Sequence, residues 1–144
     1  MILADVNVLI YAFDAHAEFH EQCREWLKAV LEEPEPYAMS PQVLCSFLRI
    51  TTHPALHQKS APMSHALRFV NALLEPEHCQ IAHPGPRHWK FFRDLCRQPG
   101  IRGNLVQDAW FAALAMEHNC EWITFDRDYA RFAGLRWGTP RLSR

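Results

Sequence analysis

The sequence predicts an α/β fold with a mainly parallel sheet of about four to five short strands, covered by helices on both faces. Short apolar segments that suit strands alternate with longer segments that suit helices, and this order is typical of a parallel sheet. The 144 residues, 49% of them apolar, are enough for one domain with a substantial core. No internal repeat, low-complexity tract or linker interrupts them. We therefore expect a single domain over residues 1–144.

The first half of the chain contains two predicted strands and four predicted helices. The strand candidates are the apolar segments 2–4 and 37–39. Apolar periodicity predicts helices over four segments: 6–13, 20–31, 41–50 and about 62–74. The third helix has the clearest start, because Ser40 suits the N-cap and Pro41 the first helical position. The apolar faces of the third and fourth helices fit either the core or a groove for a partner helix or a second copy.

The second half continues the alternation of strands and helices. Its strand candidates are 80–82, 121–124 and 135–137, and its helix candidates are 87–98, about 104–118 and a short turn or helix at 126–132. The first of these helices is basic and aromatic, and Pro99-Gly100 ends it. Asn104 is predicted to cap the second, with Gln107 at the reciprocal position of a capping box.

Charge and cysteine content argue against several classes of protein. The formal net charge is -1, so no global positive field attracts nucleic acid, although a local basic groove remains compatible. The five cysteines form no C-x-x-C pair, which predicts free thiols in a reducing compartment, the cytoplasm. No apolar stretch reaches the roughly 18 residues that a membrane span needs. The first residues lack the basic start of a secretory signal.

Three aspartates stand where a parallel sheet gathers functional groups, just beyond the carboxyl ends of its strands. Asp5 directly follows the first predicted strand, and Asp126 follows the fourth with one residue between. Asp108 is the only charged residue between Asn104 and Met116, in a helix that is apolar nearly all round. Taken singly, the three have local explanations as a helix cap, a favourable charge near a helix N-terminus and a turn residue. Their common edge favours a shared site.

Carboxylates that meet at one edge raise one another's pKa unless a positive charge neutralises them. Neither Asp5 nor Asp108 has a Lys or Arg beside it in the sequence, although Arg127 flanks Asp126. A cation that prefers oxygen ligands, Mg²⁺ or Mn²⁺, is the partner that such a cluster predicts. Because such an ion polarises a phosphoryl oxygen and lowers the pKa of a bound water, these residues indicate hydrolysis of a phosphate ester.

Several motifs resemble those of the PIN-domain ribonucleases, and specifically the VapC-type toxins of bacterial toxin–antitoxin pairs. They are LADVNVLIYAFDAH near the start, SPQVLCSFLRITTHP at 40–54, and GNLVQDAWFAALAMEHNCEWITFDRDYARFAGLRW at 103–137. The early D-x-N-x-L-I-Y combined with a late T-x-D-x-D-[FY] is fairly specific. The resemblance implies a three-layer α/β/α fold, a Mg²⁺ or Mn²⁺ site and endoribonuclease activity on RNA. It also implies homodimerisation and a VapB-like antitoxin partner.

The resemblance also implies roles for individual residues. By position, Asp5, Asp108 and Asp126 match the catalytic, metal-binding acids of the family, and Asp128 matches its accessory acid. Two polar residues, Asn7 and Thr124, match those that support the first and last of these aspartates.

One position departs from the pattern of the family. Ser46, in CSFLR, stands where the family usually carries the Glu of E-F-L-R. No other acid lies between Glu35 and Glu75, so no nearby residue replaces it. A hydroxyl brings no charge, and we therefore expect that one firmly held metal ion suffices.

Basic residues beside aromatic ones predict a surface for RNA. The segment RHWKFFRDLCRQPGIRG combines phosphate-binding side chains with rings that stack on bases, and its RNA-binding candidates are Arg87, Lys90, Arg93 and Arg102. Arg49, one turn after Ser46, is a further candidate. An ordinary amphipathic helix with its aromatic residues in the core fits the same segment. Potential zinc ligands also share a helical face, but no fourth ligand is in evidence and packing roles fit them better: His16, His20 and Cys23.

The leading hypothesis is therefore a metal-dependent endoribonuclease. The alternative is a degenerate PIN domain that binds RNA or a protein partner without cutting, and Ser46 favours it. A nucleotide- or phosphate-binding domain is disfavoured, because no glycine-rich loop follows the first predicted strand.

Overall fold

A computed structural model describes residues 1–56 and 59–142. Within these residues five strands form one sheet in the order β3-β2-β1-β4-β5, and each neighbouring pair is parallel. The strands are β1 (Ile2–Ala4), β2 (Tyr37–Met39), β3 (Cys79–Ile81), β4 (Glu121–Ile123) and β5 (Trp137–Gly138). Because β1 is the central strand, Asp5 leaves the sheet at its middle.

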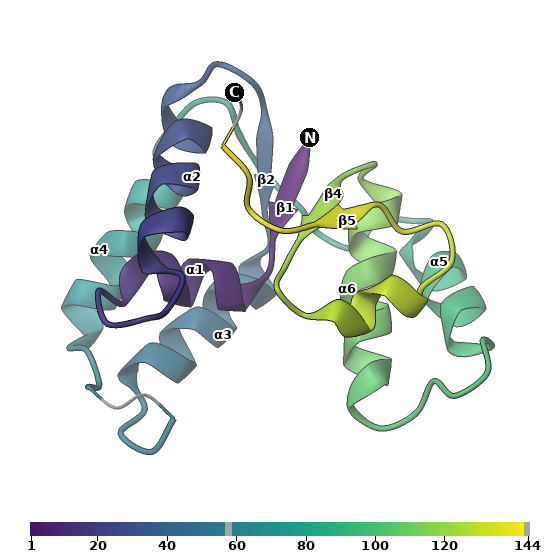
Figure 1. Ribbon diagram of the computed structural model, residues 1–144. Helices are drawn as coiled ribbons and strands as arrows, with labels where there is room; N and C mark the ends of the chain where they lie inside the picture. Colours follow the sequence, from purple (N-terminus) through teal and green to yellow (C-terminus); the bar gives the residue numbers. More distant parts are fainter. Residues whose placement is uncertain (57–58, 143–144) are drawn as a thin grey trace.

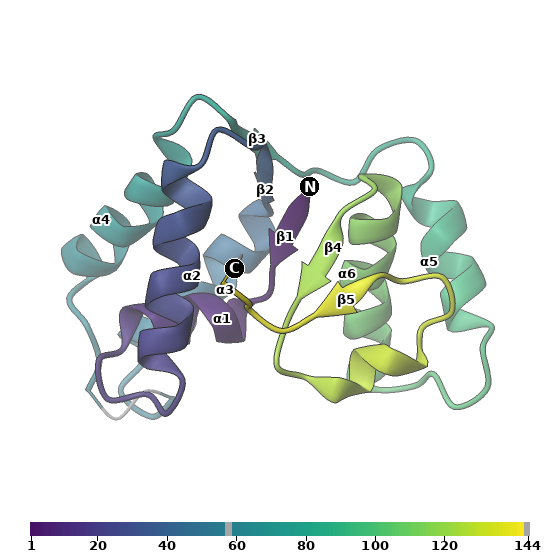
Figure 2. The same cartoon turned by 45° about the horizontal axis from the view of Figure 1, so that its top comes forward.

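Helices flank the sheet on both sides, as predicted for a three-layer α/β/α fold. They are α1 (Val6–Phe13), α2 (His20–Glu32), α3 (Pro41–Thr52), α4 (Met63–Leu74), α5 (His88–Cys96), α6 (Asn104–Glu117) and the 3₁₀ helix η1 (Arg127–Arg131). Helices α1 to α4 gather beside β1 to β3, whereas α5 and α6 pack together beside β4 and β5 (Figure 1). Figure 2 shows the sheet between these two groups of helices. No helix of the described residues is long and apolar enough to cross a membrane.

The core fixes helix α6 against the central strands. Leu3 of β1 and Trp122 of β4 have no exposed surface, and the ring of Phe111 on α6 stacks on Trp122 with 5.5 Å between centroids. Several alanines of α6 are also fully buried, including Ala109 and Ala112, so that small side chains bring the helix close to its neighbours. Asp108 is thus carried by a helix with little freedom to move.

The apolar faces of α3 and α4 belong largely to the core. Val43, Phe47, Ala66 and Leu73 are buried, which supports the core interpretation of these faces over a groove. Ser40 caps α3 as predicted, because its Oγ accepts a hydrogen bond from the backbone N–H of Val43 at 3.4 Å. All five cysteines are free, as expected.

The start of α6 differs from the prediction. Asn104 is the first residue of the helix rather than its cap, and the N-cap position is held by Gly103 without a side-chain hydrogen bond. Gly103 has a φ of +58°, which glycine adopts without the steric cost that a side chain would bring. The backbone therefore completes its turn before Asn104. Gln107 is not part of a capping box and instead lines a cavity described below.

The edge strands differ from the prediction by one or two residues. Strand β3 lies at 79–81 rather than 80–82, and β5 lies at 137–138 rather than 135–137. In β5, Trp137 pairs with Trp122 and Gly138 with Ile123. The register of an edge strand follows from the neighbour that it pairs with, and its own apolar residues do not reveal that register.

Candidate active site

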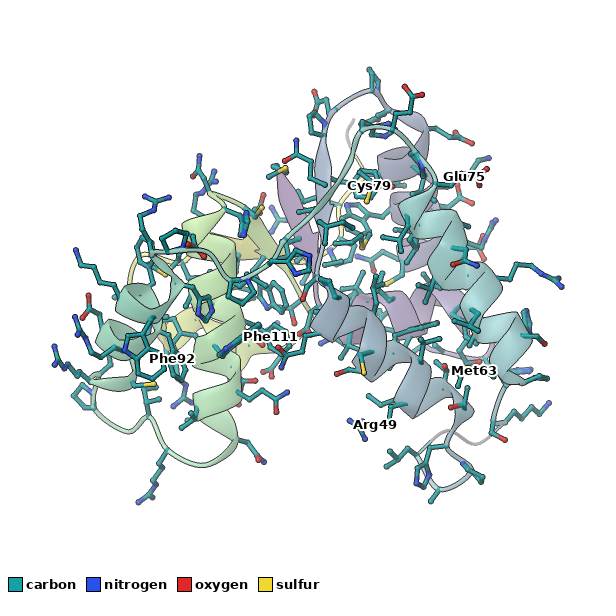
Figure 3. All side chains as sticks on the ribbon, turned by 180° about the vertical axis from the view of Figure 1, so that it is seen from behind. Arg49, Met63, Glu75, Cys79, Phe92 and Phe111 are labelled. Atoms are coloured by element: carbon teal, nitrogen blue, oxygen red, sulfur yellow. The ribbon has the colours of Figure 1, made fainter. Side chains whose placement is uncertain are left out.

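The structure brings Asp5, Asp108 and Asp126 to one cavity at the carboxyl edge of the sheet. This cavity has a volume of about 250 Å³ and lies between α1, α3, α6 and the start of η1. Phe111 on α6 and Arg49 on α3 both line it, and they lie on either side of the space between the two helices (Figure 3). The three aspartates come from segments far apart in the sequence, so only the fold creates this cluster.

Asp5 is held in a fixed orientation by hydrogen bonds. The side chain is only 7% exposed. Thr124 Oγ1 donates to its Oδ2 at 2.7 Å and Asn7 Nδ2 to the same oxygen at 3.2 Å, while the N–H of Val6 donates to Oδ1 at 2.7 Å. Asn7 also donates to Thr124 Oγ1 at 3.1 Å. The supporting positions assigned to Asn7 and Thr124 thus correspond to direct contacts with Asp5.

The environment of the cavity disfavours the ionised form of Asp5 and Asp108. Burial raises the pKa of Asp5 to about 6; the hydrogen bonds from Thr124 and Val6 oppose this rise, and the charges of Asp108 and Asp126 add to it. Burial also raises the pKa of Asp108, and the charge of Asp126 raises it further. No ion pair in the described part of the chain neutralises any of the three. A bound cation would remove this cost.

Among the residues that the structure describes, the Asp108 carboxylate has one direct hydrogen-bond partner, the buried phenol of Tyr129. The Tyr129 O–H donates to Asp108 Oδ1 at 3.4 Å, and the side chain of Tyr129 is only 2% exposed. Burial and the neighbouring aspartates raise the pKa of Tyr129, so the phenol stays protonated and remains a donor. Sequence reasoning assigned Tyr129 no role. Its place in the T-x-D-x-D-[FY] motif was the only signal.

Asp126 and Asp128 occupy different environments. The backbone N–H of Asp126 donates to Thr124 Oγ1 at 3.0 Å, and Asp126 Oδ1 accepts from the N–H of Asp128 at 2.8 Å. The carboxylate of Asp128 is 57% exposed and pairs with Arg131 at 3.3 Å, outside the lining of the cavity. The local explanations for Asp5 and Asp126 therefore also hold, since Asp5 caps α1 and Asp126 caps η1.

The wall opposite α6 carries Ser46 and Arg49. Both residues line the cavity from α3. The Arg49 side chain is exposed and makes no ion pair or side-chain hydrogen bond with any described residue. Of the basic residues predicted to bind RNA, Arg49 is the one that the structure places in this cavity.

The donor set fits a hydrated divalent cation. In the conformation of residues 1–56 and 59–142, no three His, Cys, Asp or Glu side chains are close enough together to hold a metal ion. Mg²⁺, however, keeps several of its waters and takes only one or two carboxylates directly, so it tolerates wider spacing. Three carboxylates without a basic partner provide the chemistry that such an ion requires. The alternative zinc ligands have other environments. His20 Nδ1 forms a hydrogen bond with the Tyr11 carbonyl at 2.8 Å, and Cys23 is buried.

A second buried acid, Glu117, lies at the opposite end of α6 from Asp108. Its carboxylate accepts hydrogen bonds from the N–H groups of Gly85 at 2.8 Å and Arg87 at 2.9 Å. Burial opposes ionisation here, but these two donors outweigh it and lower the pKa of Glu117. The Arg87 guanidinium donates to the Glu117 carbonyl at 3.0 Å. Sequence reasoning missed Glu117, and it instead assigned Arg87 to RNA.

The other basic candidates lie on the outer surface. Lys90 and Arg93 are exposed on α5, and Arg102 is exposed two residues before α6. Arg93 lies 3.9 Å from Asp94, an arrangement too long and too exposed to hold it strongly. The indole of Trp89, on the same helix, is 66% exposed. Helix α5 is thus an amphipathic helix whose basic residues and Trp89 face outward.

A larger cavity lies elsewhere in the molecule. It has a volume of about 560 Å³ and is lined by Met1, Trp26 and Tyr37, together with acids such as Glu33 and Glu121. The Tyr37 hydroxyl is already bonded to the Leu73 carbonyl at 2.6 Å. This cavity contains none of the clustered aspartates, so size alone does not identify the site.

Comparisons with known proteins show the family of this chain. The PIN domain family matches residues 2–135. Ribonuclease VapC25 of Mycobacterium tuberculosis is 38% identical over 142 residues, which cover 99% of this chain and 100% of that protein. Ribonuclease VapC31 of the same species is 36% identical over 142 residues, with the same coverage of both chains.

Solved structures share the fold at lower identity. VapBC2 from Rickettsia felis, bound to a DNA fragment from its promoter, aligns with a TM-score of 0.70 and 19% identity over 96% of this chain and 98% of that chain. M. tuberculosis VapC20 aligns with a TM-score of 0.64 and 15% identity over 94% and 99% of the two chains. With this fold, this order of motifs and these relatives, the chain belongs to the PIN domain family, in the group of the VapC ribonucleases.

Proposed function

We propose that the protein is a toxin endoribonuclease that hydrolyses RNA phosphodiesters with a Mg²⁺ or Mn²⁺ ion at the carboxylate cavity. The observation that supports it most is the convergence of Asp5, Asp108 and Asp126 without a basic ion-pair partner within the described residues. The relatives named as ribonucleases favour RNA as the substrate. VapC20 is described as a toxin that cleaves the sarcin–ricin loop.

Each residue of the cavity has a distinct part in this proposal. Asp5, Asp108 and Asp126 hold the ion, which polarises a phosphoryl oxygen and activates a water when bound. Thr124 and Asn7 keep Asp5 in place, and Tyr129 orients Asp108 through a neutral donor. These bonds fix the carboxylates in advance of binding, which is the condition for effective electrostatic catalysis.

Asp128 and Ser46 have weaker parts. The Asp128 carboxylate lies outside the cavity. Asp128 therefore contributes as an accessory acid through its charge, which raises the pKa of Asp108. Ser46 brings no negative charge to the cavity. We therefore propose that one ion is held firmly, by the three aspartates.

RNA approaches the cavity over the basic surface of α5 and the loop before α6. Lys90, Arg93 and Arg102 are exposed there and suit phosphate oxygens, while the exposed ring of Trp89 suits stacking on a base. Arg87 is the least available candidate, since its guanidinium is bonded to the Glu117 carbonyl.

We also propose a VapB-like antitoxin as the protein partner. Two solved neighbours favour it: a structure described as a toxin–antitoxin complex from Klebsiella pneumoniae, and VapBC-1 from nontypeable Haemophilus influenzae. A homodimer in the cytoplasm completes the proposal, and the five free thiols are compatible with that compartment. Light scattering of the purified protein, alone and with the product of a neighbouring reading frame, tests both associations.

A cleavage assay tests the activity. Purified protein is incubated with RNA and Mn²⁺, then with EDTA, and the series is repeated with Asp108→Asn. Glu25→Gln, which removes an exposed acid of α2 outside this cavity, is the matched control. We expect cleavage by the parent protein and by Glu25→Gln in Mn²⁺ only. Cleavage that survives EDTA or Asp108→Asn would contradict the metal mechanism.

The second candidate function is RNA or protein binding without cleavage. Ser46 at the usual glutamate position favours it, as does the absence of a ready three-ligand metal group among the described residues. Tight RNA binding with no cleavage in Mg²⁺ or Mn²⁺ would support this candidate over the nuclease.

A further inference from the structure

We propose that Ser46 and Arg49 form a phosphate-binding subsite on the α3 wall of the cavity, facing the three aspartates. Its ligand is a phosphodiester of the RNA backbone, which the Arg49 guanidinium and the Ser46 hydroxyl contact from one side. The inference rests on the proposed function, because it assigns the contact that holds the substrate of that same site.

Position is the first argument for this subsite. Ser46 and Arg49 are three residues apart on α3, so their side chains share one face of the helix. Both line the cavity that Asp5, Asp108 and Asp126 also line. Figure 3 shows Arg49 beside the space between α3 and α6. A guanidinium has five N–H donors in a planar fork that matches two oxygens of a phosphate.

The availability of Arg49 is the second argument. Its helix and the next one contain no acid, because none occurs between Glu35 and Glu75. Helix α2 shows the alternative at the same spacing, where Arg24 pairs with Glu21, three residues before it, at 2.5 Å. Ser46 occupies the corresponding position before Arg49. A serine there leaves the guanidinium unpaired, whereas a glutamate would capture it.

Charge balance is the third argument. An RNA phosphodiester is an anion and is repelled by a cavity with three carboxylates. One divalent ion offsets two of the three negative charges when all are ionised. The Arg49 guanidinium offsets the third, so that the cavity no longer repels the substrate. A one-ion site thus requires a second positive group, and within the lining of this cavity Arg49 is the basic residue.

Equilibrium RNA binding tests the subsite without relying on turnover. All variants carry Asp108→Asn so that RNA stays intact, and a labelled RNA that the parent protein cleaves is titrated at several salt concentrations. Arg49→Gln should weaken binding about tenfold and reduce the slope of log Kd against log salt by about 0.7, the value for one lost contact to single-stranded RNA. Arg49→Lys should keep the slope. Ser46→Glu should weaken binding as Arg49→Gln does, because the new carboxylate pairs with Arg49.

Arg68→Gln is the matched control, since Arg68 is exposed on α4 and lies outside this cavity. It should leave both the affinity and the salt slope unchanged. If Asp108→Asn protein binds RNA with the same affinity with and without Arg49→Gln, the subsite proposal is overturned and the nuclease proposal stays intact. If the parent protein neither cleaves nor binds any RNA, the proposed function fails, and the subsite fails with it.

Discussion

Two buried acids, Glu117 and Asp5, have opposite pKa shifts. Glu117, 9% exposed, receives two backbone N–H groups, and its pKa is lowered. Asp5 also receives hydrogen bonds, yet its pKa is raised to about 6, because burial and two neighbouring carboxylates outweigh them. Glu117 thus has its hydrogen-bond donors within the chain, whereas no ion pair among the described residues neutralises the cluster of Asp5, Asp108 and Asp126.

The difference separates an acid that stabilises the fold from acids that we propose to form a functional site. Glu117 holds the loop before α5 against the end of α6, and Gly85 approaches it so closely that an added Cβ would lie 2.7 Å from its Oε1. Such packing leaves no room for a ligand. The aspartate cluster instead borders a cavity, and its unfavourable charge is available to be offset by a cation.

The largest effect should come from removing charge in the cluster while keeping its local bonds. Asp126→Asn retains the Oδ1 atom that caps η1, so the fold should persist. RNA cleavage should fall at least about 100-fold. The midpoint of thermal unfolding in EDTA should stay unchanged or rise, because a repelling charge is lost.

Asp128→Asn sharpens this test, since it removes an acid two residues away that is exposed and outside the cavity. It should reduce cleavage by less than about tenfold. Equal losses in the two variants would show that the cavity does not define the site.

The two buried acids, Asp5 and Glu117, should affect the pH dependence of stability differently. Burial raises the pKa of Asp5 from its ordinary value of 3.8 to about 6, so the native state binds more protons than the unfolded state between these pH values. In EDTA the free energy of unfolding should therefore fall as pH rises from about 4 to 6, by at most about 3 kcal/mol from this group. Denaturant unfolding across this range measures it. Saturating Mg²⁺ should flatten the decline, and an unchanged decline would argue against binding at Asp5.

Glu117 should matter for stability and not for chemistry. Glu117→Ala leaves the N–H groups of Gly85 and Arg87 without their acceptor, and should lower the free energy of unfolding by about 2 kcal/mol. Denaturant unfolding gives this value, and cleavage is measured below the unfolding transition. A loss of cleavage in fully folded Glu117→Ala protein would contradict the distinction between Glu117 as a structural acid and Asp5 as a residue of the proposed site.

The smallest effect concerns the bond that positions Asp5. Thr124→Val keeps the shape of the side chain but removes the donor to Asp5, which should cost about 1 kcal/mol and raise the pKa of Asp5 further. The decline of stability in EDTA should then continue to higher pH. Thr51→Val is the control, because the buried Thr51 hydroxyl bonds only to the Phe47 carbonyl within α3. An identical pH profile for both variants would contradict a role for Thr124 at Asp5.

Sequence reasoning predicted the frame of the molecule and the position of its aspartates. Short apolar strands and periodic helices are local patterns. Asp5 directly follows β1, and Asp126 follows β4 after two intervening residues. The parallel sheet then requires these residues to meet at one edge. Asp108 could be found because a lone charge in an otherwise apolar helix needs a reason.

The remaining contacts, and the exact start of α6, depend on tertiary structure. Tyr129 reaches Asp108 from η1, and Glu117 binds a loop about thirty residues earlier, so neither contact has a local sequence pattern. The contact of Arg87 could not be predicted, because a basic residue beside aromatic ones suits RNA in any sequence, whereas its bond to Glu117 depends on how α5 meets α6. The capping box at Asn104 failed because Gly103 allowed the backbone to turn one residue earlier.

The central claim is that the aspartate cluster is a cation site. Calorimetric titration of Mn²⁺ into the protein at pH 7 tests it most directly, with Asp108→Asn and the exposed-acid control Asp94→Asn in parallel. We expect one ion per chain for the parent and for Asp94→Asn, and at least about tenfold weaker binding for Asp108→Asn. Equal Mn²⁺ affinity in all three proteins would contradict the claim.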